Sequence, residues 1–141
     1  MTLTVVAAAG ATAVYFAGEA QHRRDRSDIV RWESRALPAA RDAERVQRSV
    51  RASMRAADVA SARATLQRDL AAIVAAAVPE IVRPAAAAYV DAIKETQTSL
   101  EAVGTPKFEK AQRRAAAAFA AAEGAVRSLL CRANLPGCVQ P

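Results

Sequence analysis

Apolar residues recur three and four positions apart over the last third of the chain, and this spacing constrains the fold more than any other sequence feature. Side chains with that period lie on one face of an α-helix, whereas a strand would place them on both faces. The pattern predicts a long amphipathic helix. Its buried face consists of Phe108, Ala111, Ala115, Ala118, Ala122, Ala125 and Leu129.

The rest of the chain is also helical in character. Alanine and arginine, two of the best helix formers, supply 38 and 17 of the 141 residues. Apolar spacing, with Pro38, Pro79 and Gly104-Thr105-Pro106 as boundaries, predicts helices at 38–58, 60–78, 80–103 and 106–132. We therefore predict an all-α fold, a small antiparallel four-helix bundle. The alternative is a single helix through residues 56–61, about 60 Å long, followed by a hairpin.

The N-terminal residues 2–18 carry no charge. As a helix they would span about 25 Å, slightly less than the hydrocarbon core of a bilayer. We therefore expect residues 1–20 to form a single transmembrane anchor, with Tyr15, Phe16 and Trp32 at the membrane interface. A secretory signal and a buried core helix are the alternatives for this segment. A cap on the bundle is the alternative position for Trp32.

Residues 21–37 are rich in charge and are interpreted as a juxtamembrane segment, which leaves residues 38–132 for the bundle and 133–141 for a tail. The chain has two cysteines, Cys131 and Cys138, and Pro136-Gly137 between them suits the centre of a type II turn. We expect a disulfide loop here, with two free thiols as the alternative. A zinc site is disfavoured because it needs about four ligands and the chain has one histidine.

Two rules disagree about the side of the membrane on which the bundle lies. The basic residues His22, Arg23, Arg24 and Arg26 follow the uncharged stretch, which places the bundle in the cytoplasm. A disulfide, by contrast, persists in oxidising compartments. The alanine and arginine bias is typical of GC-rich bacterial genomes. We expect a single-pass protein of the bacterial inner membrane with an extracytoplasmic body, and a cytoplasmic body is the alternative.

The most specific surface feature is a row of arginines. The net charge is +6, which favours anionic partners. On the predicted 38–58 helix, five arginines fall within an arc of about 120°, opposite the apolar face. They are Arg41, Arg45, Arg48, Arg51 and Arg55. This row is a candidate face for an anionic partner, and a solvated surface is the plainer interpretation. Nucleic acid is disfavoured because no nucleic-acid-binding motif is present.

The sequence contains no recognisable constellation for catalysis. His22 is the single histidine, the acidic residues are dispersed, and no phosphate-binding glycine loop is present. We therefore expect a non-enzyme without a cofactor, metal or small-molecule substrate. The leading hypothesis is a membrane-anchored accessory or scaffold subunit of a larger membrane protein complex, in contact with membrane lipid. The alternative is a membrane-tethered or secreted binding module that uses the arginine row to hold lipid, polymer or nucleic acid.

Overall fold

The computed structural model describes the backbone of residues 6–138 and the side chains of residues 17–138. Within this range the chain forms four α-helices and one short 3-10 helix, and no strand. The elements are α1 (Val6–Ser49), α2 (Ala56–Ala76), η1 (Glu80–Val82), α3 (Arg83–Glu101) and α4 (Phe108–Arg132). The predicted all-α class is confirmed.

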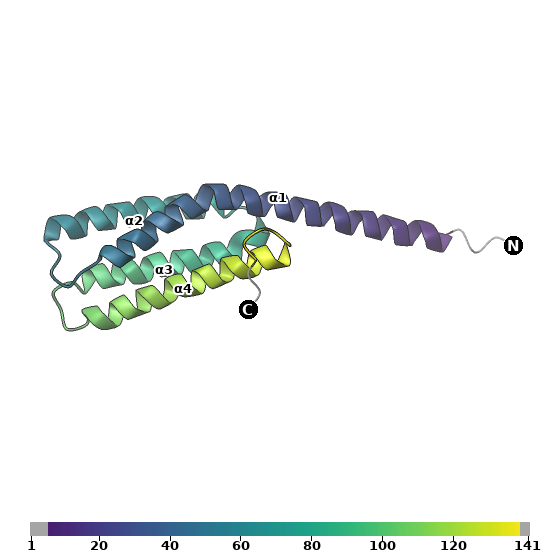
Figure 1. Ribbon diagram of the computed structural model, residues 1–141. Coiled ribbons are helices and arrows are strands. Elements are labelled where there is room, and N and C mark those ends of the chain that lie inside the picture. Colours follow the sequence, from purple (N-terminus) through teal and green to yellow (C-terminus); the bar gives the residue numbers. More distant parts are fainter. Residues whose placement is uncertain (1–5, 139–141) are drawn as a thin grey trace.

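The four helices form an antiparallel bundle built from two hairpins (Figure 1). Helix α1 packs on α2 and α3 packs on α4, while further contacts between α2 and α3 and between α1 and α4 close the bundle. The α1–α2 and α3–α4 turns lie at one end of the bundle. The connection through η1 and the C-terminal loop lie at the other end, where α1 leaves the bundle (Figure 1).

The core combines large apolar side chains with many alanines. Ile29, Trp32, Leu66, Ile73 and Ile93 are each at most 1% exposed. Alanine lies between them at Ala36, Ala40, Ala43, Ala92, Ala115 and Ala122, each equally buried. Because alanine keeps a helix surface low, neighbouring helices can approach closely. The predicted face of α4 is buried at Phe108, Ala111, Ala115, Ala122 and Leu129 and half-buried at Ala118 and Ala125.

The start of the first bundle helix differs from the prediction. Pro38 lies inside α1 rather than at a helix start, and the charged segment 21–37 is part of the same helix. Proline removes one backbone hydrogen bond in a helix interior. The helix nevertheless continues because Ala36 and Ala40, on either side of Pro38, are packed in the core. The bundle therefore begins near Ile29, the first buried residue among the described side chains of α1, and not at residue 38.

The first turn also differs from the prediction. Helix α1 ends at Ser49 and α2 begins at Ala56, so the connection covers 50–55 rather than a turn near residue 58. Val50 is 2% exposed, which means that the chain leaves the helix by burying an apolar side chain in the core. Residues 56–61 do not form a turn, because they belong to α2, but the alternative of one long helix through them is wrong, because the chain breaks at 50–55. Helix α1 itself is 44 residues long.

The N-terminal part of α1 projects from the bundle as a helical arm (Figure 1). We use "the arm" for residues 6–28, which span about 34 Å at the rise of an α-helix. From Ala17 onward, most of its side chains are exposed. No helix among the described residues combines the length and apolarity required to cross a bilayer.

Candidate functional site

The five arginines of the predicted anionic-partner face are all exposed, but they do not lie on one helix. Arg41, Arg45 and Arg48 lie on α1, whereas Arg51 lies in the connection and Arg55 is the N-cap residue of α2. The prediction assumed that the helix continues to residue 58 and turns by about 100° per residue. In the structure, α1 ends at Ser49. The continuous row therefore shortens to its first three members.

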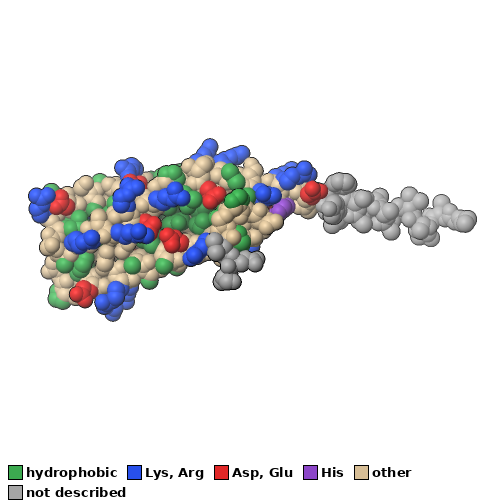
Figure 2. All heavy atoms as spheres, in the orientation of Figure 1, with side chains coloured by type: hydrophobic (Ala, Val, Ile, Leu, Met, Phe, Trp, Pro, Cys, Tyr) green, Lys and Arg blue, Asp and Glu red, His purple; other side chains and the backbone are tan. Residues whose placement is uncertain are grey.

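Most of these arginines also bind groups within the protein. Arg45 pairs with Asp42 at 2.7 Å, Arg48 pairs with Glu44, and Arg55 pairs with Asp58 at 2.9 Å. The hydrogen bond between the last two raises the pKa of Arg55 and lowers the pKa of Asp58. Figure 2 shows acidic side chains interspersed among the Lys and Arg side chains of the visible face.

Arg51 has a local structural role. Its guanidinium Nη1 donates to the carbonyl oxygens of Arg48 at 2.5 Å and Val50 at 2.9 Å. A basic side chain at this position satisfies carbonyl groups at the C-terminal end of α1 that have no partner within the helix. Among the described residues, Arg41 and Arg51 are the members of the five without an ion pair, and Arg51 is already bound to backbone carbonyls. The geometry therefore gives little support to a concentrated anion-binding face.

An ion-pair network that the sequence did not reveal joins α1 to α2. Arg68 reaches Asp42 across the helices at 2.6 Å and pairs with its neighbour Asp69 at 3.0 Å. Asp69 is 2% exposed, and its second carboxylate oxygen, Oδ2, has no hydrogen-bond partner within the described structure. Burial raises the pKa of Asp69, while the hydrogen bond from Arg68 opposes this effect.

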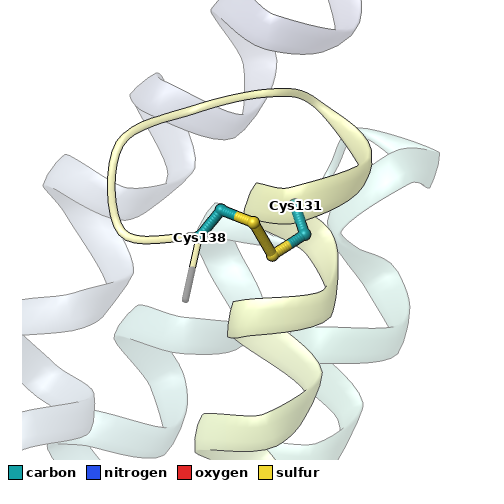
Figure 3. Close-up of a disulfide and its surroundings, with 2 residues drawn as sticks. All are labelled: Cys131 and Cys138. Carbon is teal, nitrogen blue, oxygen red and sulfur yellow. A yellow bond between two sulfur atoms is a disulfide. The ribbon is translucent and has the colours of Figure 1, made fainter. Parts of the chain in front are cut away.

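The predicted disulfide between Cys131 and Cys138 is confirmed (Figure 3). Cys131 lies in the last turn of α4, and the chain then reverses through Asn134, which has a φ of 54°. The N–H of Leu135 donates to the carbonyl of Leu130, and that of Asn134 donates to Cys131, which is a Schellman cap. This cap places Leu135 in the core, where it is 9% exposed.

The turn inside the disulfide loop also matches the expected residue types. Gly137 has a φ of 96°, as position i+2 of a type II turn requires, and the N–H of Cys138 donates to the carbonyl of Leu135 at 3.4 Å. Glycine is needed for a second reason, since an added Cβ would lie 3.1 Å from Cδ1 of Leu130. The loop is therefore held by the cap, the turn and the covalent bond.

The three predicted membrane-interface residues have different outcomes. The side chains of Tyr15 and Phe16 lie outside the described residues. Trp32 is 1% exposed and belongs to the core of the bundle, so its side chain cannot face lipid in this fold. The interface position predicted for Trp32 is corrected to a core position because α1 enters the bundle at Ile29, before residue 32.

Trp32 has an unusual environment for a core residue. Its indole Nε1 is buried and has no acceptor among the described residues. A buried donor without a partner costs about 1–3 kcal/mol. Trp32 also lines a groove of about 480 Å³ between α1 and the end of α2, together with charged residues of α1.

A second groove lies beside Tyr89, between α1, α3, α4 and the disulfide loop. Its volume is about 420 Å³, and both Pro136 and Gly137 form part of its wall. Burial raises the pKa of Tyr89 to about 12, with a further contribution from the carboxylate of Glu123. The groove is lined by three carboxylates and two guanidiniums, so it has no excess of positive charge that would favour an anion.

Comparisons with protein-family models, with curated proteins and with solved structures each returned no match to this chain. Among the described residues, no group of three or more His, Cys, Asp or Glu side chains is arranged to hold a metal ion. The functional interpretation therefore depends on the arm, the bundle surface and the two grooves.

Proposed function

We propose that this protein is a non-catalytic accessory subunit, held at a membrane by its N-terminal segment, whose bundle docks on a larger membrane protein complex. The observation that carries the proposal is the projection of α1 beyond the bundle (Figure 1). The bundle core begins at Ile29, so the residues before it contribute little to folding. Most of the stability of a helix in a protein comes from the packing of one face, and the described side chains of the arm are mostly exposed.

The uncharged stretch, residues 2–18, favours a partner that is apolar, whereas the rest of the arm is rich in charge. Residues 2–18 contain no charged side chain, and alanine and glycine are frequent among them. Small residues allow helices to approach closely inside a bilayer, where packing rather than the hydrophobic effect drives association. We therefore propose that this stretch packs on transmembrane helices of the partner complex, which would compensate for its modest apolarity.

The disulfide supports a position for the bundle on the extracytoplasmic side of the membrane. Disulfides persist in oxidising compartments and are rare where thiols are kept reduced. The bond between Cys131 and Cys138 closes the end of the bundle from which the arm projects. In the proposed arrangement, this end faces the membrane surface.

The experiment compares the full chain with a variant that lacks residues 1–20. Both are expressed in a bacterial host, membranes are solubilised gently, and the species are separated by native electrophoresis. We expect the full chain in the membrane fraction within a larger complex, and the shortened chain in the soluble fraction at its own mass. Migration of the full chain as a free species of 14.9 kDa would contradict the proposal.

Thermal unfolding of the shortened variant is the control for folding. Because the core begins at Ile29, we expect the melting temperature to stay close to that of the full chain. If the shortened variant remains folded and still sediments with membranes, the arm is not the anchor, and the proposed role of the N-terminal segment is wrong.

A further inference from the structure

The groove beside Trp32 is lined by two guanidinium groups that have no acceptor among the described residues. Arg31 and Arg35 lie one helical turn apart on α1, and both line the groove. Their side chains are exposed, and neither forms an ion pair among the described residues. Trp32, next to Arg31 in sequence, also lines the groove, and its buried indole Nε1 has no acceptor among the described residues.

The charge of this groove favours an anion. Asp28 is the single acidic residue in its lining, so the two guanidiniums leave a net positive charge. Guanidinium groups bind carboxylates with charge-assisted hydrogen bonds in a planar geometry that suits two oxygens. The donors thus match a carboxylate better than a neutral polar group or a cation.

The opposite wall of the groove is apolar. It is formed by the end of α2 and the connection after it, including Val78 and Pro79. Val78 is 77% exposed, which is unusual for a large apolar side chain beside a core residue. A ligand that places a hydrocarbon group on Val78 and an anion at the arginines would use both halves of the groove. Its volume, about 480 Å³, lies within the range typical of small-molecule sites.

We propose that this groove binds a small amphiphilic carboxylate. The carboxylate lies between Arg31 and Arg35, and the hydrocarbon chain lies on Val78 and Pro79, beside the Trp32 side chain. A free ligand is favoured over a membrane lipid because Trp32 lies about 21 Å along α1 from Gly18, where the uncharged stretch ends. The choice of a free ligand over a lipid rests on the proposed membrane anchor, whereas the groove and its charge do not.

Trp32 provides a specific readout because it is the single tryptophan of the chain. The full chain, labelled with ¹⁵N in zwitterionic nanodiscs, is titrated with sodium hexanoate while its one indole N–H signal is followed by NMR. We expect a saturable shift. The neutral isostere hexanamide, which carries the same hydrocarbon chain, should bind at least tenfold more weakly.

Two double variants test the arginines. We expect Arg31→Gln with Arg35→Gln to weaken hexanoate binding at least tenfold, whereas Arg23→Gln with Arg24→Gln, on the exposed arm, should change it less than twofold. Both pairs are exposed, and circular dichroism checks that the variants are folded. Each of three results would overturn the proposal: no saturable shift, equal binding of hexanoate and hexanamide, or equal losses in the two double variants.

Discussion

Arg68 on α2 reaches Asp42 on α1, with 2.6 Å between Nη2 and Oδ2, and the same guanidinium pairs with the buried carboxylate of Asp69. This guanidinium is two-thirds exposed, so its bonds contribute little to stability by themselves. Asp69 is different because its carboxylate is buried and Oδ1 accepts hydrogen bonds from Arg68, whereas Oδ2 has no partner in the described structure. The network therefore makes the stability of the α1–α2 hairpin depend on pH.

Asp69→Asn should reduce that dependence. Burial raises the pKa of Asp69 in the folded state. The favourable contribution of Asp69 to the free energy of unfolding is therefore fully present at a pH below its unfolded pKa, where the carboxyl is protonated. This contribution is lost as pH rises through the folded pKa. We expect the variant to gain stability relative to wild type between pH 3 and pH 7, reaching about 1 kcal/mol. Urea denaturation at several pH values measures this. Asp91→Asn, at an exposed position of α3, is the control, and an equal change in both variants would contradict the prediction.

Replacement of both cysteines by serine should destabilise the bundle by about 2–3 kcal/mol, the loss expected for a closed loop of this length. Thermal unfolding with and without dithiothreitol measures the effect. Reductant should lower the melting temperature of the wild type and leave that of the double serine variant unchanged. A wild-type melting temperature that does not respond to complete reduction would mean that the cap and the turn hold the loop without the bond.

Replacement by alanine should change the stability of the protein in opposite directions at two glycines, Gly137 and Gly124. Gly137→Ala should destabilise by about 1–2 kcal/mol, because residue 137 has a φ of 96° and a new Cβ would press on Leu130. Gly124→Ala should stabilise by about 0.5–1 kcal/mol, because Gly124 lies inside α4 with no atom within 4 Å of an added Cβ. Denaturation midpoints of the two variants test the pair, and a shift of the same sign in both would not fit this structure.

Substitutions of Trp32 distinguish a core residue from a membrane-interface residue. Trp32→Ala should cost about 3–5 kcal/mol, as expected for a large buried aromatic side chain. Trp32→Phe should cost less, because it keeps part of the aromatic contacts and removes the donor that has no acceptor. Chemical denaturation of the chain without residues 1–20 measures both. A near-neutral Trp32→Ala variant would place the side chain outside the core.

The sequence predicted what depends on local chemistry. Apolar spacing identified the face of α4, and Pro136-Gly137 between two cysteines indicated the disulfide loop. It failed where tertiary packing decided the outcome. Pro38 looks like a helix start, but the burial of Ala36 and Ala40 keeps α1 continuous through it.

The predicted arginine row failed for the same reason. Helix α1 ends at Ser49 without a glycine or proline to signal its end, and the burial of Val50 directs the chain into the connection. The pairing of Arg68 with Asp42 joins residues on different helices, and no local pattern indicates it. The Trp32 groove depends on the position of α2 relative to α1, which helical periodicity does not specify.

The continuity of α1 has a geometric consequence. Because one helix runs from the projecting arm to Trp32, the number of residues between them determines which side of the bundle faces a given direction. Insertion of one alanine near residue 24 would turn the bundle by about 100° and displace it by about 1.5 Å relative to the first residues of the helix. A partner that grips both the arm and the bundle would thus be sensitive to rotational phase, while the folding of the bundle itself would be unaffected.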